Sequence, residues 1–568
     1  MRDEVMITKP KKTLIVLLLL TVAPFAVTCP RRGDTSNTGL EARKQNAAGS
    51  NQPGGGMPAL PSVILDTAYA RPSGKTITVR RGGDFQAALD AARPGDEIVL
   101  EAGAEFLGNF KLPKKDGNSD RWIVIRSSAP ESSMPQGKRV SPSQKDLMPK
   151  LLTPNASPVL KTAPAAHHFR FVGIEFSIAP TVNRISAIIS LGDDRQASLP
   201  SIPHDLIFDR CFVHGTPSAN VRRGFALNSA RTSIIDSHIS DCHEVGADSQ
   251  AIAGWTGPGP FKIVNNYLEG AGENLMFGGG DAKIEGLVPS DIEIRRNHFF
   301  KPLSWKKGHP EYAGKAWSVK NLFELKNARR VLIDGNLFEH NWKASQVGYA
   351  ILFKSANSTG DAPWSVTEDV TFTNNIVRHT AAGISILGRD YQDPSEQVKR
   401  ILIRNNLFYG LDKGKWGGDG AFLKITDTDS VTVDHNTILQ TGNIITAYGE
   451  PSTNFTFTNN MIQHNRYGVK GDSSAVGNET LERYFASLVF KKNVIAGGRS
   501  SSYPADNYFQ AAPEGAPIMN QARGEIRLTD LPSSDKIGTD GKAIGCDLVA
   551  LKRAGVHLEN DYGVTEEK

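Results

Sequence analysis

Three charged residues on two short segments form the clearest candidate for chemistry in this sequence. Glu324 and Lys326 alternate with apolar residues in "NLFELK", residues 321–326, and Lys354 ends the similar segment "YAILFK", residues 349–354. Apolar alternation with period two is typical of a β-strand, so we expect the charged side chains to point outward. A lysine with a lowered pKa can accept a proton, while a second lysine neutralises a substrate carboxylate. That combination suits β-elimination on a uronic-acid polymer.

The same charges also have an ordinary structural explanation. Outward Lys and Glu side chains are usually solvated, and a diagonal Glu324–Lys354 salt bridge would contribute less than about 1 kcal/mol. Other groups in the neighbouring loops are also candidates for a base, namely His309, Tyr312, Tyr349, His379 and Tyr391. The sequence leaves the choice between these groups open.

Three more residues near these strands are candidates for binding. Arg389 and Asp390 follow the strand-like segment "GISILG", residues 383–388. Both can contact substrate, and the carboxylate of Asp390 can also bind a calcium ion. Lys424 occupies the position of Glu324 in the segment "GAFLKI", so we expect it to contact substrate on the same face.

Tryptophans gather in the long loops that flank these strands. None lies in an apolar strand position, where a core tryptophan would be expected. Exposed tryptophans beside a groove suit stacking on sugar rings, whereas the alternative is that the loops pack their own aromatics as small satellite cores. We expect the first arrangement for Trp255, Trp305, Trp317, Trp342, Trp364 and Trp416.

The strands belong to an internal repeat. Segments such as "DVTFTNNIVRHT" and "RILIRNNLFYGL" carry apolar residues five and three positions before an Asn and two positions after it. The first fitting position is 174 and the last is 493, so eleven coils have a mean period of (493 − 174)/10, about 32 residues. The Asn slot is filled at positions 266, 297, 336, 375, 406, 436, 460 and 493.

Stacked coils would place these Asn side chains above one another in a hydrogen-bonded amide ladder. Because Asn tolerates left-handed backbone angles, we expect the same residues to form the sharp turns. The pattern predicts an all-β protein, a single-stranded right-handed parallel β-helix of about eleven coils over residues 71–500. We expect an N-terminal helix after Asp84 to cap it, and residues 501–568 to form an irregular C-terminal cap or tail.

This repeat resembles the pectate-lyase-like superfamily of right-handed parallel β-helices. The opening "GGDFQAALDAARPGDEIVLEAGAEFLGNFKLP", residues 82–113, is most similar to the alginate lyase and chondroitinase B type. That resemblance implies a Lys/Arg pair and often calcium in the active site. The paired-Asp and Gly-His patterns of polygalacturonase-like glycosidases and the Asp-Pro-His-Asp signature of mannuronan epimerases are not found in the sequence.

Each coil of this superfamily has three strands, and the Asn turn joins the second to the third. The segments 321–326 and 349–354 are then first strands of successive coils. Alignment of their inward residues puts Lys354 beside Lys326, one coil on and about 4.8 Å away.

The first 29 residues have the features of an export signal. Lys9, Lys11 and Lys12 precede the 14-residue apolar stretch Leu14 to Val27, and Cys29 follows where a bacterial lipoprotein would carry its lipid. Lipidation, simple secretion and an uncleaved anchor all remain open. Residues 30–70 are rich in Gly, Ser, Asn and Pro and predict a flexible linker. We therefore expect a bacterial protein that is periplasmic, anchored to the outer membrane or extracellular.

The charge balance and the cysteine content limit which binding partners are expected. Lys and Arg exceed Asp and Glu by 65 − 60 = 5 without a long basic run, so nucleic acid has little support while an anionic polymer fits. Three widely spaced cysteines in the body predict buried thiols and neither a disulfide framework nor a metal site. We expect a monomer whose only membrane contact is the signal segment or lipid.

Three functions are consistent with these residues. The first is a polysaccharide lyase that cleaves an acidic polysaccharide. The second is a glycoside hydrolase of a neutral or sulfated glycan, which needs a pair of carboxylates spaced for hydrolysis. The third is a non-catalytic, carbohydrate-binding or adhesive surface protein.

Overall fold

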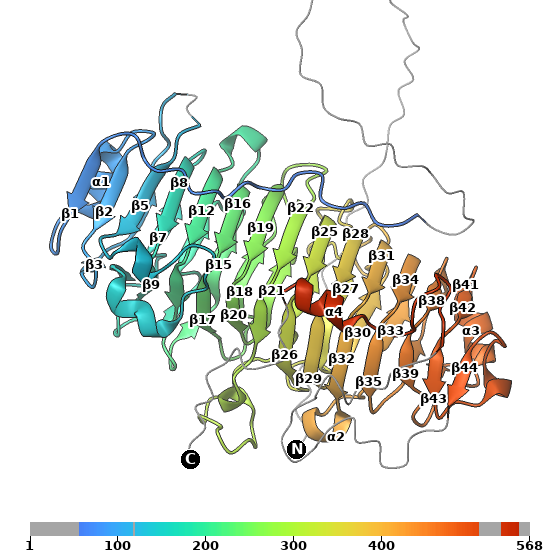
Figure 1. Cartoon of the computed structure of the whole chain (residues 1–568). Helices are drawn as coiled ribbons and strands as arrows, with labels where there is room; N and C mark the ends of the chain where they lie inside the picture. The colour runs from blue at the N-terminus through green and yellow to red at the C-terminus, as the bar shows by residue number, and fades with distance from the viewer. Residues whose placement is uncertain (1–55, 118–119, 511–535, 556–568) are drawn as a thin grey trace, which may run out of the picture. The chain divides into compact units, whose positions relative to one another are not determined.

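Three long parallel sheets wind around one apolar core, as the sequence predicts for a right-handed parallel β-helix (Figure 1). The computed structural model describes residues 56–117, 120–510 and 536–555. The three sheets are called A, B and C, and their strands are given below. In each coil the chain passes through a strand of sheet C, then one of sheet A, then one of sheet B. Every strand pairs in parallel with the equivalent strand of the next coil; for example, Phe323 of one coil lies beside Ile351 of the next.

Sheet A has the strands β1 (Thr76–Val79), β2 (Glu97–Leu100), β5 (Ile123–Ser127), β8 (His167–Val172), β12 (His204–Asp209), β16 (Ala230–Ile235), β19 (Gly259–Val264), β22 (Ser290–Arg295), β25 (Ala328–Asp334), β28 (Thr367–Thr373), β31 (Lys399–Arg404), β34 (Asp429–Asp434), β37 (Ser452–Thr453), β38 (Thr456–Thr458), β41 (Phe485–Ala486) and β42 (Val489–Lys491). Sheet B has the strands β3 (Glu105–Leu107), β6 (Lys150–Thr153), β9 (Glu175–Ile178), β13 (Phe212–His214), β17 (His238–Cys242), β20 (Tyr267–Gly270), β23 (His298–Phe300), β26 (Leu337–Asn341), β29 (Ile376–Thr380), β32 (Leu407–Leu411), β35 (Thr437–Gln440), β39 (Met461–Gln463), β43 (Val494–Ala496) and β44 (Tyr508–Gln510). Sheet C has the strands β4 (Phe110–Leu112), β7 (Leu160–Thr162), β11 (Ile189–Leu191), β15 (Arg223–Leu227), β18 (Gln250–Gly254), β21 (Glu273–Phe277), β24 (Phe323–Leu325), β27 (Tyr349–Lys354), β30 (Ala382–Leu387), β33 (Leu423–Thr426), β36 (Ile445–Ala447) and β40 (Val469–Gly471). A small pair is formed by β10 (Arg184–Ile185) and β14 (Asn220–Val221).

The core consists of the apolar columns that the repeat predicts. Phe171 and Phe208 occupy the same slot in successive coils, and their rings stack with centroids 5.1 Å apart. Both side chains are fully buried. Because each coil leaves its strand edges unpaired, burial of these columns and pairing between coils stabilise one another, so single coils have no stability of their own.

The amide ladder predicted from the Asn slots is confirmed. Each Asn side chain donates from Nδ2 to Oδ1 of the next Asn at 2.9 to 3.1 Å, from Asn266 through Asn493. The ladder continues to Asn507, which the repeat did not predict. The left-handed turn was assigned to the wrong residue, because a positive φ occurs one position earlier, as at Asn265 and Arg296. A ladder Asn is instead held by its side chain and its backbone N–H, both of which bond along the stack.

Helices cover both ends of the coil. The helix α1 (Phe85–Ala91) packs against β1 and β4, and Oδ1 of Asp84 accepts a hydrogen bond from the backbone N–H of Ala87, as predicted for an N-cap. At the other end α3 (Asn478–Tyr484) packs against β40 and β41.

The described part of the tail, residues 536–555, runs back along the outer face of sheet B. Its helix α4 (Leu548–Arg553) buries Leu551 against the outward side chains Leu337, Ile376, Leu407 and Tyr409. This part of the tail therefore covers a side of the β-helix.

The segment before the first strand includes residues 56–70 of the predicted flexible linker, whose residues 30–55 lie outside the described part of the chain. Residues 56–70 cross the strands of sheet A (Figure 1). The backbone N–H of Ala59 donates to Asp369 at 3.0 Å, and the N–H and hydroxyl of Ser62 donate to Asp291 at 2.7 and 2.8 Å. Polar side chains of sheet A thus replace the core that this Gly/Pro/Ser-rich segment lacks.

The predicted export signal and Cys29 lie outside the described residues. Among the residues that the structure does describe, helices are too short or too polar to cross a membrane. Cys211 and Cys242 are buried free thiols, as expected, and Cys546 is half-buried.

Candidate functional site

The predicted lysine pair lies on the outer face of sheet C. Leu325 of β24 is in register with Phe353 of β27, so Lys326 and Lys354 follow side by side in successive coils, as the sequence predicts. The side chain of Lys326 is 16% exposed and that of Lys354 is 29% exposed. Among the described residues, neither Nζ atom makes a hydrogen bond to another side chain or to the backbone.

A buried carboxylate holds the two lysines together. Oε1 of Glu324 lies 3.6 Å from Nζ of Lys326 and 3.5 Å from Nζ of Lys354, and the Glu324 side chain is 1% exposed. Nδ2 of Asn321 donates to the other carboxylate oxygen at 3.2 Å. Burial by itself raises the pKa of Glu324, but the charges of Lys326, Lys354 and Lys320 and the hydrogen bond from Asn321 together outweigh burial, so that the pKa is lowered and the group is ionised.

A second buried carboxylate, which the sequence analysis missed, lies one coil earlier. Glu273 begins β21, is fully buried and accepts a hydrogen bond from Nε2 of Gln250 at 2.7 Å. Nζ of Lys320 lies 3.7 Å from Glu273 and 2.5 Å from Asp248. Burial and the neighbouring charge of Glu324 raise the pKa of Glu273 to about 7. The face therefore carries one ionised carboxylate and one that titrates near neutral pH.

Lys301 fixes the backbone that leads into Glu273. This fully buried lysine donates from Nζ to the carbonyls of Gly270, Ala271 and Gly272, at 3.0 Å to Ala271 and 3.2 Å to Gly272, and to Oδ1 of Asn274 at 3.1 Å. Burial lowers the pKa of Lys301 to about 7. Because its donors are saturated by this backbone, we assign Lys301 a positioning role.

Of the two glycines beside Lys326, only Gly278 is needed to make room for it. Gly278 has a φ of +93°, and a Cβ there would lie 2.7 Å from Cβ of Lys326. At Gly279, with a φ of +83°, a Cβ would lie 3.6 Å from Cδ of the same lysine. A side chain at Gly278 would push Lys326 away from Glu324, so this position requires glycine.

The expectation of exposed tryptophans is wrong for four of the six. Trp305, Trp317, Trp342 and Trp416 are 4 to 7% exposed and pack with Val319 into a satellite core, which is the alternative that the sequence left open. Trp416 is the last residue of the short helix α2 (Lys413–Trp416). These loops leave sheet B and meet one another because their own apolar residues need cover.

The satellite core supports the candidate site from one side. It includes Ala271, whose carbonyl accepts a hydrogen bond from Lys301. The two remaining tryptophans are half-buried. Trp255 lies under the guanidinium of Arg223, 4.7 Å from the ring centroid, and Nε1 of Trp364 donates to the carbonyl of Leu287 at 3.2 Å.

The other predicted binding residues lie away from the lysine pair. Lys424 is in register with Glu324, but three coils on, and its Nζ lies 4.6 Å from the ring centroid of Tyr448. Arg389 is bound to Asp427, with NH1 2.8 Å from Oδ1. The structure does not bring these residues together with Lys326.

The expected calcium ligand also has another role. Oδ1 of Asp390 accepts the backbone N–H of Gln392 at 3.2 Å, so its carboxylate stabilises a turn. Glu324 and Glu273 face lysine ammonium groups, whereas calcium prefers six to eight oxygen ligands. These residues therefore do not fit a calcium ion.

Three of the five candidate bases from the loops are engaged elsewhere. The hydroxyl of Tyr349 donates to Asp419 at 2.8 Å, and that of Tyr391 donates to Asp427 at 2.7 Å. Nδ1 of His379 lies 3.6 Å from Glu339 on the outer face of sheet B. Lys326 and Lys354 remain the better candidates for contact with substrate.

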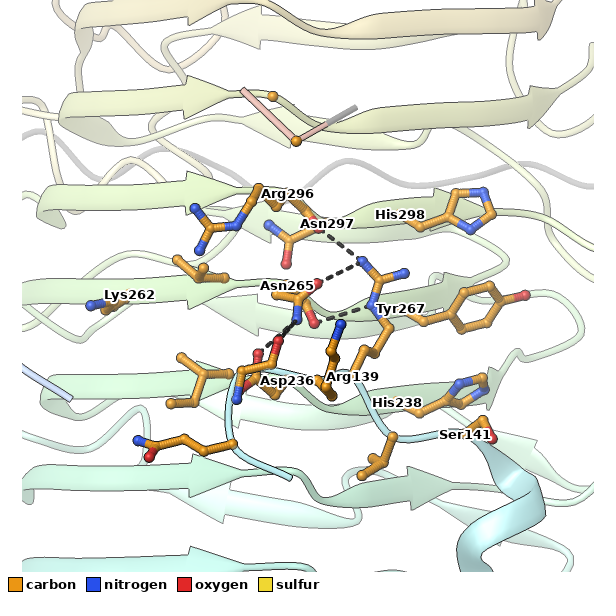
Figure 2. Close-up of a pocket in the computed structure, with 18 of the residues that line it drawn as sticks. Arg139, Ser141, Asp236, His238, Lys262, Asn265, Tyr267, Arg296, Asn297 and His298 are labelled. Atoms are coloured by element: carbon orange, nitrogen blue, oxygen red, sulfur yellow. Dashed lines mark hydrogen bonds between the residues drawn. The ribbon is translucent and has the colours of Figure 1, made fainter. Parts of the chain in front are cut away.

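A large cavity lies on a different part of the molecule. It encloses about 1010 Å³ beside the turns between sheets A and B (Figure 2). Arg139 crosses it and donates to the carbonyls of Asn265 and Arg296, at 3.1 and 2.8 Å. Asp236 accepts the N–H of Gly137 and Nδ2 of Asn265, at 2.9 and 2.7 Å. These polar groups attach the loop 136–141 to the β-helix.

Comparison with known proteins agrees with the fold. Residues 321–503 match the family model described as a right-handed β-helix region. No curated protein matches the chain. The solved structure of the PL6 family alginate lyase AlyGC is 12% identical, with 81% of this chain and 60% of that chain covered and a TM-score of 0.42. The chain thus spans less than two thirds of AlyGC.

Two further solved structures are also similar to the chain. A mannuronic acid-specific family 6 polysaccharide lyase from human gut microbiota is 13% identical, with 79% of this chain and 94% of that chain covered and a TM-score of 0.43. A mutant tailspike protein of E. coli bacteriophage HK620 is 10% identical, with 72% and 62% covered and a TM-score of 0.39. From its three parallel sheets and its match to the family model, the chain is a right-handed parallel β-helix protein.

Proposed function

We propose that this chain cleaves an acidic polysaccharide by β-elimination on the outer face of sheet C. The observation that carries the proposal is the pair of partly exposed ammonium groups, Lys326 and Lys354, placed side by side over the buried carboxylate of Glu324. A surface ion pair built for stability would share its hydrogen bonds fully. Here each lysine keeps donors available to a ligand.

The geometry favours a carboxylate as that ligand. Each ammonium has three N–H donors, and the closest carboxylate oxygen lies 3.5 to 3.6 Å away, which leaves the contact ionic. The strands that carry the two cations are about 4.8 Å apart along the stack, and a single uronate carboxylate can bridge cations on adjacent rungs. Glu324 orients both lysines from below without blocking them.

β-Elimination needs two groups of this kind. One ammonium neutralises the uronate carboxylate and thereby acidifies the neighbouring C–H bond. The second lysine, after it has released one proton to solvent, accepts that proton while the glycosidic C–O bond on the next carbon breaks and a C=C bond forms. The leaving oxygen then takes a proton from solvent or from the ammonium that has just formed.

The expected location suits such a substrate. The basic and apolar stretches before Cys29 lead us to infer export from a bacterial cell, where the chain would meet polysaccharides as a monomer. Whether lipid or simple secretion follows is left to mass spectrometry of the mature N-terminus.

The proposal is tested by incubating purified protein with alginate, pectate and glycosaminoglycans and following the ultraviolet absorbance of the new C=C bond. We expect absorbance with at least one polymer and its loss in Lys326→Ala and Lys354→Ala. Lys470→Ala is a matched control, because Lys470 is also an outward lysine of sheet C but lies five coils from β24. Silence across the whole panel would contradict the proposal.

One observation favours glycoside hydrolysis as a second candidate. The pKa of Glu273 is raised to about 7, whereas that of the neighbouring Glu324 is lowered, and such a split is typical of an acid and base pair. Both carboxylates are at most 1% exposed, which places them below the sugar-binding surface. Hydrolysis would release new reducing ends without unsaturation, and Glu273→Gln would abolish it. Binding without any product would instead support the non-catalytic alternative.

A further inference from the structure

The long loops that lead from sheet B into sheet C carry an excess of positive charge. We call this set the basic rim, and it consists of residues 301–322, 342–348 and 412–422. The three loops contain eight lysines and three acidic residues, which gives a net charge of 8 − 3 = +5 with histidine neutral. They enter β24, β27 and β33, so the basic rim lies along the edge of sheet C where its strands begin.

The long loops at the opposite edge of sheet C are acidic. This acidic rim leads from sheet C to sheet A and consists of residues 278–289, 355–366 and 388–398. It contains two basic and six acidic residues, which gives 2 − 6 = −4. A negatively charged chain bound at Lys326 and Lys354 is therefore attracted towards the basic rim and repelled by the acidic rim.

The three loops of the basic rim form one surface. Each contributes a tryptophan to the satellite core, namely Trp305, Trp342 and Trp416. The backbone N–H of Lys343 also donates to the carbonyl of Trp416 at 3.0 Å, which joins the second loop to the third. Figure 1 shows α2, which belongs to the third loop, at the lower edge of the β-helix. Because the loops share a core, their charged residues have fixed positions relative to one another.

Three lysines, one from each loop, gather around Trp416. Nζ of Lys306 lies 5.9 Å from the ring centroid of Trp416, and Nζ of Lys415 lies 5.2 Å from it. Lys343 is so close that a Cβ at Gly417 would lie 3.0 Å from its own Cβ. Lys343 and Lys415 are exposed and Lys306 is half-buried. Within the part of the chain that the structure describes, their Nζ atoms make no ion pair and no hydrogen bond.

The acidic residues of the basic rim do not neutralise these lysines. Oδ1 of Asp412 accepts the backbone N–H of Gly414 at 2.7 Å and caps α2. Oδ2 of Asp419 accepts the hydroxyl of Tyr349 at 2.8 Å. The third acidic residue, Glu311, forms no ion pair with a described residue. The repulsion between the lysines is thus unopposed by a neighbouring carboxylate, and an anionic ligand would relieve it.

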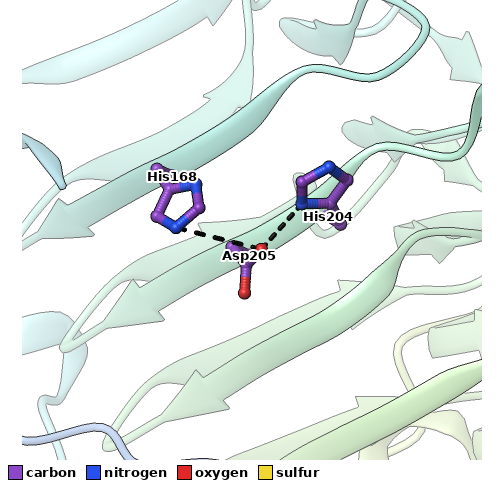
Figure 3. A group of neighbouring side chains, drawn as sticks. All are labelled: His168, His204 and Asp205. Carbon is purple, nitrogen blue, oxygen red and sulfur yellow. Dashed lines mark hydrogen bonds and ion pairs between the residues drawn. The ribbon is translucent and has the colours of Figure 1, made fainter. Parts of the chain in front are cut away.

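A group on sheet A shows the contrast. Figure 3 shows the rings of His168 and His204 on either side of the Asp205 carboxylate. Nδ1 of His204 lies 2.7 Å from Oδ2 of Asp205, and Nε of Arg231 donates to Oδ1 at 2.8 Å. The donors of this group are used within the protein, whereas those of the three lysines around Trp416 are available to a ligand.

We propose that the basic rim is a second binding surface for an acidic polysaccharide, which Lys306, Lys343 and Lys415 hold by its negative charges. Lys354 ends β27, and the rim begins where this strand begins, so the six residues of β27 separate them by about 20 Å at 3.3 Å per residue. A polymer can span this distance and contact both surfaces, whereas a single uronate cannot. The identity of the polymer rests on the proposed function, but the charge of the rim is independent of cleavage.

The test measures binding of the purified full chain to immobilised alginate, pectate and heparin by surface plasmon resonance at low and at high ionic strength. Lys326→Ala is the background, because under the proposed function it leaves the polymer intact. On the polymer that binds best, the triple variant Lys306→Gln, Lys343→Gln and Lys415→Gln should bind at least about 10-fold more weakly at low ionic strength. The difference should shrink at high ionic strength, because salt screens exposed charges.

A matched control removes the same charge from elsewhere. Lys75→Gln, Lys145→Gln and Lys491→Gln alter three exposed lysines outside both rims and should leave binding unchanged. Glutamine keeps part of each aliphatic stem, and thermal unfolding verifies that both triple variants fold.

Four results would overturn the proposal. They are equal binding by the two triple variants, a loss that is the same at both ionic strengths, no binding of any of the three polymers, and tighter binding of duplex DNA than of these polymers. The ultraviolet assay for the C=C bond is a separate measurement. Its failure together with rim-dependent binding would contradict the lyase and leave the basic rim as a polysaccharide-binding surface.

Discussion

Outward-facing charged residues on sheet A and on sheet C of this β-helix differ in how closely they pair. On sheet A, acidic and basic residues of adjacent rungs form bidentate pairs. Arg330 binds Asp291 with distances of 2.7 and 2.8 Å, and Arg400 binds Asp369 with the same two distances. On sheet C, the lysines around Glu324 stay 3.5 to 3.6 Å from its carboxylate.

This difference indicates which charged residues have a structural role. A guanidinium presents a planar fork that matches a carboxylate, so each sheet A pair uses its donors internally. Asp291 and Asp369 also accept hydrogen bonds from the segment 56–70, which adds to their structural role. An ammonium is a point charge with three donors, and two of them share one buried carboxylate on sheet C. The lysines of sheet C therefore keep N–H donors for a ligand, whereas the arginines of these sheet A pairs keep few.

The largest expected effect is on activity. Lys326→Ala should lower the rate of polymer cleavage at least about 100-fold, because it removes either the proton acceptor or the cation that neutralises the uronate. Arg330→Ala on sheet A should leave the rate unchanged. Initial rates of C=C formation on the best polymer of the panel check both variants.

Equal losses in the two variants would break the comparison, because they would mean that Lys326 acts only through stability. Circular dichroism melts of the same preparations separate that outcome from a catalytic one. A Lys326→Arg variant adds a further readout. Arginine keeps the positive charge but cannot act as a base, so retained activity would assign the proton transfer to Lys354.

The next effect is on stability and concerns the carboxylates. Glu324→Gln should cost about 2 kcal/mol, because the lysines lose their buried counter-charge while the shape of the side chain is kept. Asp291→Asn should cost about 1 kcal/mol, since its pair with Arg330 lies closer to solvent. Urea unfolding of both variants measures the difference, and a larger loss for Asp291→Asn would reverse the order proposed here.

The position of Lys326 beside Lys354 could be predicted from sequence for a definite reason. Alternation fixes which residues point inward, and stacking of equivalent strands then fixes the neighbours of every outward residue. The same logic predicted the Asn ladder from Asn266 to Asn493. It misplaced the left-handed turn, because hydrogen bonds along the stack hold the ladder Asn and shift the turn to the preceding residue.

The sequence could not predict which side chains the loops bury or bring into contact. Burial of Trp305 and Trp416 depends on which loops meet, and loop lengths vary from coil to coil without a repeat. Glu273 lies at the start and Lys301 at the end of one coil, and neither position breaks the apolar pattern in a way that signals a buried charge. Lys320 lies three residues before Phe323, but its contact with Asp248 depends on another loop.

Acidic groups on the two faces should titrate with opposite effects on stability. The pKa of Glu273 is raised from 4.5 to about 7, so its contribution is present below pH 4.5 and is lost as the pH rises towards 7. Hydrogen bonds from Arg330 lower the pKa of Asp291 from 3.8 to about 2, so its contribution is present above pH 3.8 and is lost as the pH falls towards 2.

Urea midpoints measured across the acidic and neutral range check this difference. Relative to Glu273→Gln, the unaltered chain should lose stability between pH 4.5 and 7. Relative to Asp291→Asn, it should lose stability only below pH 3.8. Parallel curves for the unaltered chain and Glu273→Gln would show that this carboxyl is not held near neutral pH and would remove the acid and base argument for hydrolysis.

The smallest expected effect is also the most direct test of the contrast. Lys354→Met, which keeps the aliphatic stem and removes the charge, should change the free energy of unfolding by less than about 0.5 kcal/mol, because its ion pair is long and its side chain partly exposed. Because Lys354→Met also removes a like charge beside Lys326, a small increase in the free energy of unfolding is possible in the sum. Arg400→Met should cost about 1 kcal/mol, because Asp369 and Glu368 both lose a hydrogen bond. If Lys354→Met is as costly as Arg400→Met, the lysines of sheet C are part of the scaffold. If it costs nothing and abolishes cleavage, they are kept for the substrate.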